Sequence, residues 1–223
     1  MTIVSCLDAL LSNFQTARTE SDLHAALEFA TCTLGFSGFA MGHHVDLARP
    51  PEDAISLSTY DKSWVSHHVG RRYYSDDPIH IASTKTVVGF LWRDVGNFIR
   101  LTPRHKQILT EAAAFGLGEG FTVPVYLPGE YHGTCSFSAR SLDNLIPDAL
   151  AVAQLCGTFA FETGRRIMRA RSSIAIEPAP ILTDRQHDAL TLVGRGKTDP
   201  EIGHILGVSR ATAHEHVEAV RNA

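Results

Sequence analysis

A change of sequence pattern near Ile181 constrains this chain more than any other feature. Before that residue, helical periodicities alternate with short stretches of aromatic and β-branched residues, whereas three short helical patterns follow it. The stretch at 172–181 reads SSIAIEPAPI, with two prolines and little periodicity, which is typical of an interdomain linker. The sequence therefore predicts two domains, at residues 1–171 and 182–223, joined by this linker.

The first domain is predicted to be α+β, an α/β/α sandwich. Apolar residues at helical spacing predict two helices before Gly35, further helices at 62–73, 78–84 and 103–115, and a long helix over 143–171. Turns at Pro50-Pro51 and at Pro128-Gly129 join neighbouring strand patterns, which favours antiparallel pairing. We expect about five strands, with helices flanking the sheet, in segments 36–45, 54–60, 87–92, 120–127 and 132–139.

Composition and charge exclude several classes of protein. With 44% hydrophobic and 20% charged residues, the 223-residue chain has the composition of a soluble globular protein and not of a disordered one. No apolar run is long enough to span a membrane, and the first residues lack the positive start of a secretory signal, so we expect a cytoplasmic protein without membrane contact. The four cysteines and twelve histidines show no metal-ligand spacing, and we predict no metal and no cofactor.

The second domain is predicted to be a small all-α unit. Thr183 is placed to cap its first helix, with Leu190 and Val193 facing inward, and Thr198 or Asp199 to cap the second. Gly207 would then break the chain before a third helix capped by Ser209, and the second helix would pack through Ile202, Ile205 and Leu206. This order predicts a helix-turn-helix, although spacing alone fits a helical hairpin of another small bundle equally well.

The same segment resembles the DNA-binding domain of LuxR-type regulators. The matching elements are Leu182-Thr183, Gly196-Lys197, Glu201-Ile202, Gly207-Val208-Ser209 and His216. The resemblance implies DNA contacts from a set of polar residues at the turn and in the third helix: Lys197, Ser209, Arg210, Thr212, His214 and Glu215. It also implies a homodimer on double-stranded DNA. The family's usual last helix would follow Ala223, so we expect the 223-residue chain to bind DNA weakly.

A second resemblance, to the autoinducer-binding domains of these regulators, covers most of the first domain. Its elements are Tyr60, Trp64, Asp77-Pro78 and Trp92, followed by Gly120 and Pro124. It implies a small-molecule signal, an N-acyl homoserine lactone, as ligand. Taken singly, Asp77-Pro78 is equally a helix N-cap followed by proline, and Trp92 is equally a core residue.

The chemistry of such a ligand fits these residues. The lactone carbonyl needs a donor such as the Trp64 indole, and the amide N–H needs an acceptor such as the Asp77 carboxylate. The amide carbonyl needs a second donor, for which Tyr60 or Ser138 is suited, while Trp92 would enclose the ligand and Gly120 would lie beside the pocket.

His68 is the departure that bears on the ligand's identity. It lies one helical turn after Trp64 and shares its face, at a position where the family usually has tyrosine. Because imidazole is shorter and more polar than phenol, a polar-substituted or aromatic acyl group becomes an alternative to a plain straight chain.

An enzyme is the rival class. The stretch GLGEGF at 116–121 superficially resembles a phosphate-binding loop, but it precedes a strand and not a helix, and no GxSxG or HExxH motif occurs. We therefore predict a ligand-responsive transcription regulator and no enzyme. A sensor of a different metabolite with the same output and a small-molecule hydrolase are the alternatives, which ligand profiling against turnover would separate.

Overall fold

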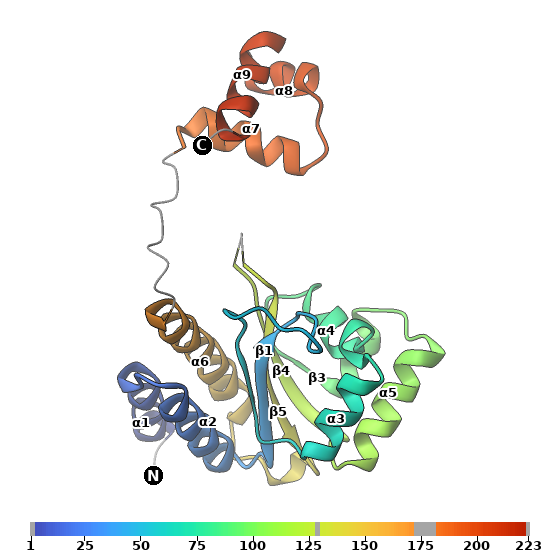
Figure 1. The fold of residues 1–223 in the computed structure, drawn as a ribbon. Coiled ribbons are helices and arrows are strands. Elements are labelled where there is room, and N and C mark those ends of the chain that lie inside the picture. The colour runs from blue at the N-terminus through green and yellow to red at the C-terminus, as the bar shows by residue number, and fades with distance from the viewer. Residues whose placement is uncertain (1–2, 128–129, 172–181, 222–223) are drawn as a thin grey trace. The chain divides into compact units, whose positions relative to one another are not determined.

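The chain divides into two compact units, residues 1–173 and 174–223 (Figure 1). The computed structural model describes residues 3–127, 130–171 and 182–221, and each unit is treated by itself. The proposed linker at 172–181 lies outside the described residues, and the limits at 171 and 182 stay predictions.

The first unit is built on a five-stranded antiparallel sheet, as far as the described residues show. Its strands are β1 (Gly38–His43), β2 (Ser56–Ser58), β3 (Phe90–Leu91), β4 (Glu119–Val125) and β5 (Gly133–Ala139), in the order β2-β1-β5-β4-β3. The β1–β2 and β4–β5 neighbours follow in sequence, as predicted. Strand β1 also pairs with β5, from far along the chain, with Gly38 opposite Ser138. The predicted fold class is confirmed.

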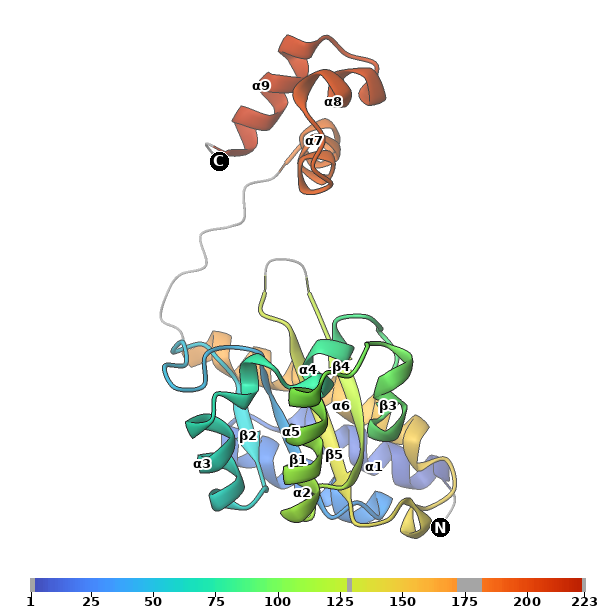
Figure 2. The same cartoon turned by 90° about the vertical axis from the view of Figure 1, so that its right-hand side faces the viewer.

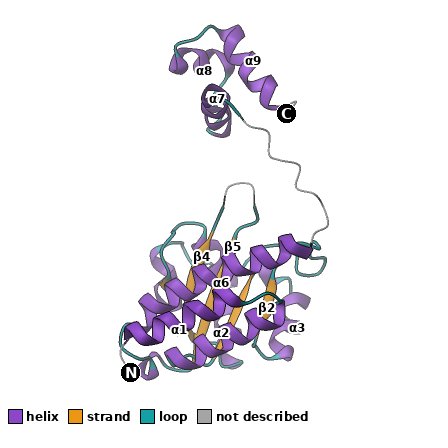
Figure 3. Cartoon of the chain, turned by 90° about the vertical axis from the view of Figure 1, so that its left-hand side faces the viewer, coloured by secondary structure: helices purple, strands orange, loops and turns teal. Residues whose placement is uncertain are grey.

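Helices cover both faces of this sheet. One face carries α1 (Ile3–Thr16), α2 (Glu20–Leu34) and α6 (Ala149–Arg171), seen in Figure 3. The other carries α3 (Lys62–Gly70), α4 (Pro78–Ser83) and α5 (Pro103–Ala114), seen in Figure 2. Short 3-10 helices, η1 (Tyr73–Ser75), η2 (Trp92–Asn97) and η3 (Leu142–Asn144), lie in the connections. Helix α6 begins later than the predicted residue 143, because Asp148 adopts a left-handed φ of 61° that no helix continues through.

The two faces of the sheet differ in polarity. Successive strand residues point to opposite faces, so Met41, Cys135 and Phe137 join the buried core under α1, α2 and α6. Thr134 and Ser136 alternate with these residues and therefore face the α3–α5 layer. The sheet thus presents a polar face to the helices that hold most of the predicted site residues.

The second unit contains α7 (Asp184–Gly194), α8 (Asp199–Leu206) and α9 (Arg210–Arg221). The Thr183 side chain caps α7, Thr198 forms a capping box with Glu201 at α8, and Ser209 Oγ accepts the Thr212 N–H at the start of α9. Gly207 ends α8 with φ 69°, a conformation that favours glycine. The predicted helix, glycine turn and helix are confirmed.

The apolar side of this unit differs from the expected one. Its buried centre is Ala189, Ile202 and Ala213, whereas Leu190, Val193 and Ile205 are exposed. Leu190 is one residue beyond Ala189, and a step of one residue turns a side chain about 100° around a helix. The predictions that Leu190, Val193 and Ile205 face inward are wrong, because close helix packing selected the small residue at 189.

Candidate functional site

A cavity lies between the polar face of the sheet and the α3–α5 layer. Its volume is about 180 Å³, whereas one water needs roughly 10–15 Å³, so it has room for a small organic molecule. Of the seven predicted ligand-binding residues, five line it: Tyr60, Trp64, His68, Asp77 and Trp92. Helix α5 closes it with Ile108, Leu109 and Ala112.

The start of α3 presents two hydrogen-bond donors to the cavity. Asp61 caps this helix by accepting the Ser63 N–H at 2.7 Å, which places Tyr60 just before the helix and Trp64 in its first turn. No acceptor among the described residues bonds the Trp64 indole N–H, although the side chain is buried. The Tyr60 hydroxyl is buried without a well-formed hydrogen bond, and burial raises the pKa of Tyr60 more than the nearby Ser138 hydroxyl lowers it. Both groups are thus protonated donors.

Asp77 has two functions in the structure. One carboxylate oxygen caps α4 by accepting the Ile79 N–H at 2.9 Å, and the other lies 3.2 Å from His68 Nε2. Burial raises the pKa of Asp77, but the His80 and His68 rings and the Ile79 N–H together hold it below its ordinary value. The carboxylate is therefore ionised. Asp77 can serve both as the N-cap of α4 and as a hydrogen-bond acceptor in the cavity wall. The structure also shows that His68 contacts Asp77.

Trp92 is held in place through Gly120. The Trp92 indole donates to Thr122 Oγ1 at 2.8 Å, and Thr122 in turn bonds Ser136 Oγ at 2.8 Å. A Cβ atom on Gly120 would lie 2.5 Å from the Trp92 ring, so glycine is needed here for the ring to approach β4 this closely. Gly120 supports the cavity wall from behind and does not line the cavity.

The polar residues on β5 differ from the predicted choice. Ser138 is buried and does not line the cavity, whereas Thr134 and Ser136 do. The period of two along a strand puts all three on one face, and only the position of the helices decides which of them meet the cavity. His80 was also missed, although its spacing of three residues from Asp77 in α4 would have suggested it.

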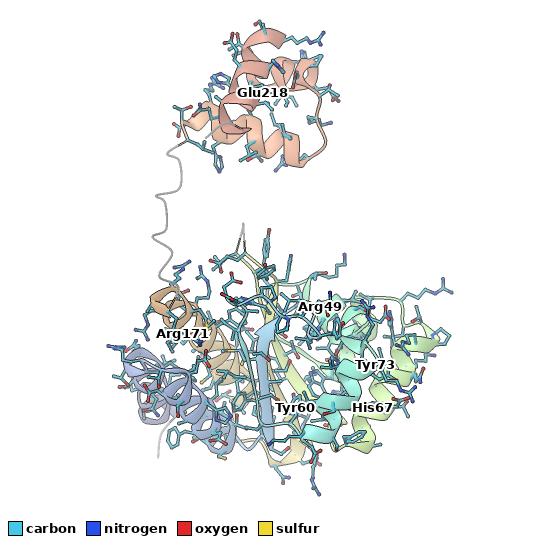
Figure 4. All side chains as sticks on the ribbon, in the orientation of Figure 1. Arg49, Tyr60, His67, Tyr73, Arg171 and Glu218 are labelled. Atoms are coloured by element: carbon cyan, nitrogen blue, oxygen red, sulfur yellow. The ribbon has the colours of Figure 1, made fainter. Side chains whose placement is uncertain are left out.

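A clamp of side chains joins α3 to α5 on the outer side of this layer. Glu111 on α5 accepts from Tyr73 Oη at 2.6 Å and contacts His67 Nε2 at 2.6 Å. Figure 4 labels Tyr60, His67 and Tyr73 on this side of the sheet. The clamp keeps α5 over the cavity.

His44 lies behind the cavity, where it stacks on His80 and contacts strand β5. Its ring stacks on His80 with 4.1 Å between centroids, and its Nε2 lies 3.3 Å from Thr134 Oγ1. Burial, followed by the neighbouring His80, lowers the pKa of His44 to about 2. The ring is therefore neutral in the folded protein and takes up a proton on unfolding below its ordinary pKa of about 6.5.

We expect this proton uptake to lower the stability of the first unit as the pH falls. When the pKa of a group is lower in the folded state than in the unfolded state, the full stability is present at pH values above the unfolded pKa. As the pH falls below the unfolded pKa, the unfolded chain takes up a proton and this stability is lost. Between pH 7 and pH 5, His44 alone accounts for a loss of about 2 kcal/mol in the free energy of unfolding. Urea denaturation at both pH values should show His44→Gln losing less than the parent, and an equal loss in both would contradict the assignment.

The predicted DNA-binding residues of the second unit differ in whether their side chains are exposed or bonded to other residues of the unit. Arg210 is exposed, and no partner for its side chain occurs among the described residues. His214 is turned toward α8, with Nδ1 2.8 Å from Asp199 Oδ2, and Lys197 lies 3.6 Å from Glu201. Ser209 and Thr212 bond each other in the cap of α9, and Glu215 is exposed. Within residues 182–221, Arg210 is thus a cation at the start of α9 to which no described side chain is bonded.

Comparison with known proteins places the chain in a family. The model of the autoinducer binding domain matches residues 19–163. The transcriptional activator protein AhyR of Aeromonas hydrophila is 27% identical over 92% of this chain and 80% of its own length. SdiA of Escherichia coli, solved with octanoyl-rac-glycerol, has a TM-score of 0.60 at 23% identity over 100% of this chain and 89% of SdiA. CepR2 of Burkholderia cenocepacia, described as an N-acylhomoserine lactone dependent LuxR family factor, has a TM-score of 0.57 at 16% identity over 75% and 96%.

The chain belongs to the autoinducer-binding family and is a LuxR-type quorum-sensing transcription regulator. Since its relatives are regulators, it is not an enzyme. No helix in the described part of the chain is long and apolar enough to cross a membrane. The described residues also hold no group of three or more potential metal ligands.

Proposed function

We propose that the cavity binds the head group of an N-acyl homoserine lactone. The observation that carries this is the set of polar side chains lining the cavity: the Trp64 indole and the Tyr60 hydroxyl, two donors without a well-formed bond to an acceptor among the described residues, lie beside the ionised acceptor Asp77. The lactone carbonyl takes the indole N–H, the amide carbonyl takes the Tyr60 hydroxyl, and the amide N–H donates to Asp77. The apolar side chains from α3 and α5 enclose the acyl group.

Thermal melts over a panel of acyl homoserine lactones test this proposal. A ligand that binds only the folded unit stabilises it by RT ln(1 + [L]/Kd), about 1.4 kcal/mol at tenfold excess over Kd. We expect upward shifts of the melting temperature for a chemically related subset of the panel. Unchanged melting temperatures for every member in folded protein would refute the lactone, and shifts with another metabolite class would favour the alternative sensor.

We further propose that two copies of the second unit bind double-stranded DNA in the cytoplasm, as a homodimer. From Leu182 to Ala223, five Lys and Arg oppose six Asp and Glu, so one copy is slightly acidic and attracts phosphates weakly. Two copies double the contacts and match a palindromic site.

Arg210 is the residue on which this DNA contact depends most. We expect Arg210→Ala to weaken binding to a promoter fragment and to reduce the salt dependence of log K by about one per copy, because one phosphate contact is lost. Arg195, an exposed arginine at the end of α7, is the matched control, and Arg195→Ala should leave the slope unchanged. Equal slopes for both variants in fluorescence anisotropy titrations would remove Arg210 from the interface.

A further inference from the structure

His80 is a polar group in the cavity wall that the lactone head group leaves unused. Its ring lines the cavity from α4, three residues after Asp77, and its Nδ1 atom is buried without a hydrogen-bond partner. Only two other buried side-chain atoms among the described residues share this condition, on Tyr60 and on His43. Tyr60 is assigned to the amide carbonyl. His43 also borders the cavity, but its Nδ1 already accepts the Ile55 N–H, and its ring packs against Phe161 of α6, a helix of the opposite layer.

The surroundings of His80 make it a hydrogen-bond acceptor. Burial lowers the pKa of His80, so the ring is neutral and carries one proton. The backbone carbonyl of Tyr74 faces the ring and can only accept, so the nitrogen toward it carries that proton. The remaining ring nitrogen has a lone pair and needs a donor, which neither a carbonyl nor a hydrocarbon chain supplies.

His80 lies near the part of the cavity where the acyl chain would leave the amide group of the ligand. The His80 and His68 ring centroids are 6.4 Å apart, and His68 contacts the Asp77 carboxylate that is assigned to the amide N–H. A donor that reaches His80 therefore lies only a few bonds from the amide. The hydroxyls of Thr134 and Ser136 on the sheet make the facing wall polar as well.

We propose that the signal is an N-(3-hydroxyacyl) homoserine lactone whose hydroxyl donates to His80. This inference rests on the proposed lactone function and names the class of acyl group. A 3-oxo group, which can only accept, meets the lone pair of His80 and is disfavoured. An unsubstituted chain leaves the buried nitrogen without a partner. His80 is thus a specificity-determining residue, in addition to the head-group residues.

The test compares lactones that differ only at the third acyl carbon. For each even chain length, the unsubstituted, 3-oxo and 3-hydroxy forms are titrated calorimetrically into the full chain. We expect the 3-hydroxy form of the best-fitting length to bind about tenfold more tightly than either other form, the effect of one buried hydrogen bond. In His80→Phe, which keeps an aromatic ring against His44, this preference should fall below about twofold. His105→Gln, a change to a histidine in the first turn of α5 that does not line the cavity, should keep it, since glutamine can take over its place in the capping box.

The outcomes separate this inference from the proposed function. If no lactone binds, the proposed function fails; if lactones bind without favouring the 3-hydroxy form, or if His80→Phe keeps that preference, only the role of His80 is overturned. Nitrogen-15 NMR of the His80 ring gives a second measurement that needs no variant. We expect one unprotonated ring nitrogen in the free protein whose resonance moves on adding the 3-hydroxy ligand but not the unsubstituted one. A protonated or unresponsive nitrogen would overturn the inference.

Discussion

Replacing Asp77 with asparagine is expected to lower the affinity for acyl homoserine lactones by about ten- to a hundredfold. A hydrogen bond to a buried charged acceptor contributes about 1.5–3 kcal/mol, and the amide oxygen that remains is a weaker, uncharged acceptor. Asparagine still caps α4 through its side-chain oxygen, so the fold is expected to persist. Isothermal titration of the variant and the parent measures the difference directly.

Asp61 provides the matched control for this change. It caps α3 as Asp77 caps α4, accepting the Ser63 N–H, but it is exposed and does not line the cavity. Asp61→Asn should therefore leave the affinity unchanged within about twofold, since surface substitutions cost little. If both variants bind the ligand as tightly as the parent, Asp77 is only a helix cap.

Substituting Gly120 by alanine is expected to lower the free energy of unfolding by about 1–3 kcal/mol, the usual cost of overpacking. The added methyl would lie 2.5 Å from Trp92 Cε2 and 2.7 Å from the Phe137 carbonyl oxygen. The carbonyl belongs to the paired strand β5, and the indole is held by Thr122, so neither withdraws freely. Because Trp92 lines the cavity, its displacement should also weaken ligand binding. Urea denaturation and ligand titration measure the two effects.

Gly118, two residues earlier, is the control for that substitution. A Cβ atom there would meet only the Ala113 side chain, at 3.7 Å, which is an ordinary contact. Gly118→Ala should change the free energy of unfolding by less than about 0.5 kcal/mol. Equal stability of the two variants would show that the Trp92 ring yields to the methyl.

In the candidate site, local sequence spacing predicted some features and could not predict others. Trp64 and His68 share a face because they lie four residues apart on one helix. Asp77 caps α4 through its carboxylate, and Pro78 occupies the first helical position after it. Both features were predicted from neighbours in the chain. Ser138 was predicted and Ser136 was not considered, and alternation along a strand cannot say which of the two lies opposite the helices that close the cavity. The contact between His68 and Asp77 also required the angle between α3 and α4, which no periodicity contains.

Local sequence patterns predict most of the helices, the strands and the caps of α7 and α8, because these features depend on residues close together in the chain; the start of α6 at Ala149 is an exception. Packing between distant segments, in contrast, sets the pairing of β1 with β5, the burial of Ala189 in place of Leu190, and the position of His80 in the cavity wall. The physical reason is that such contacts join segments far apart in sequence, where packing against distant partners outweighs local preference. Shifting a helix by one residue or a strand by two leaves the local pattern almost unchanged, yet alters which side chains meet the ligand.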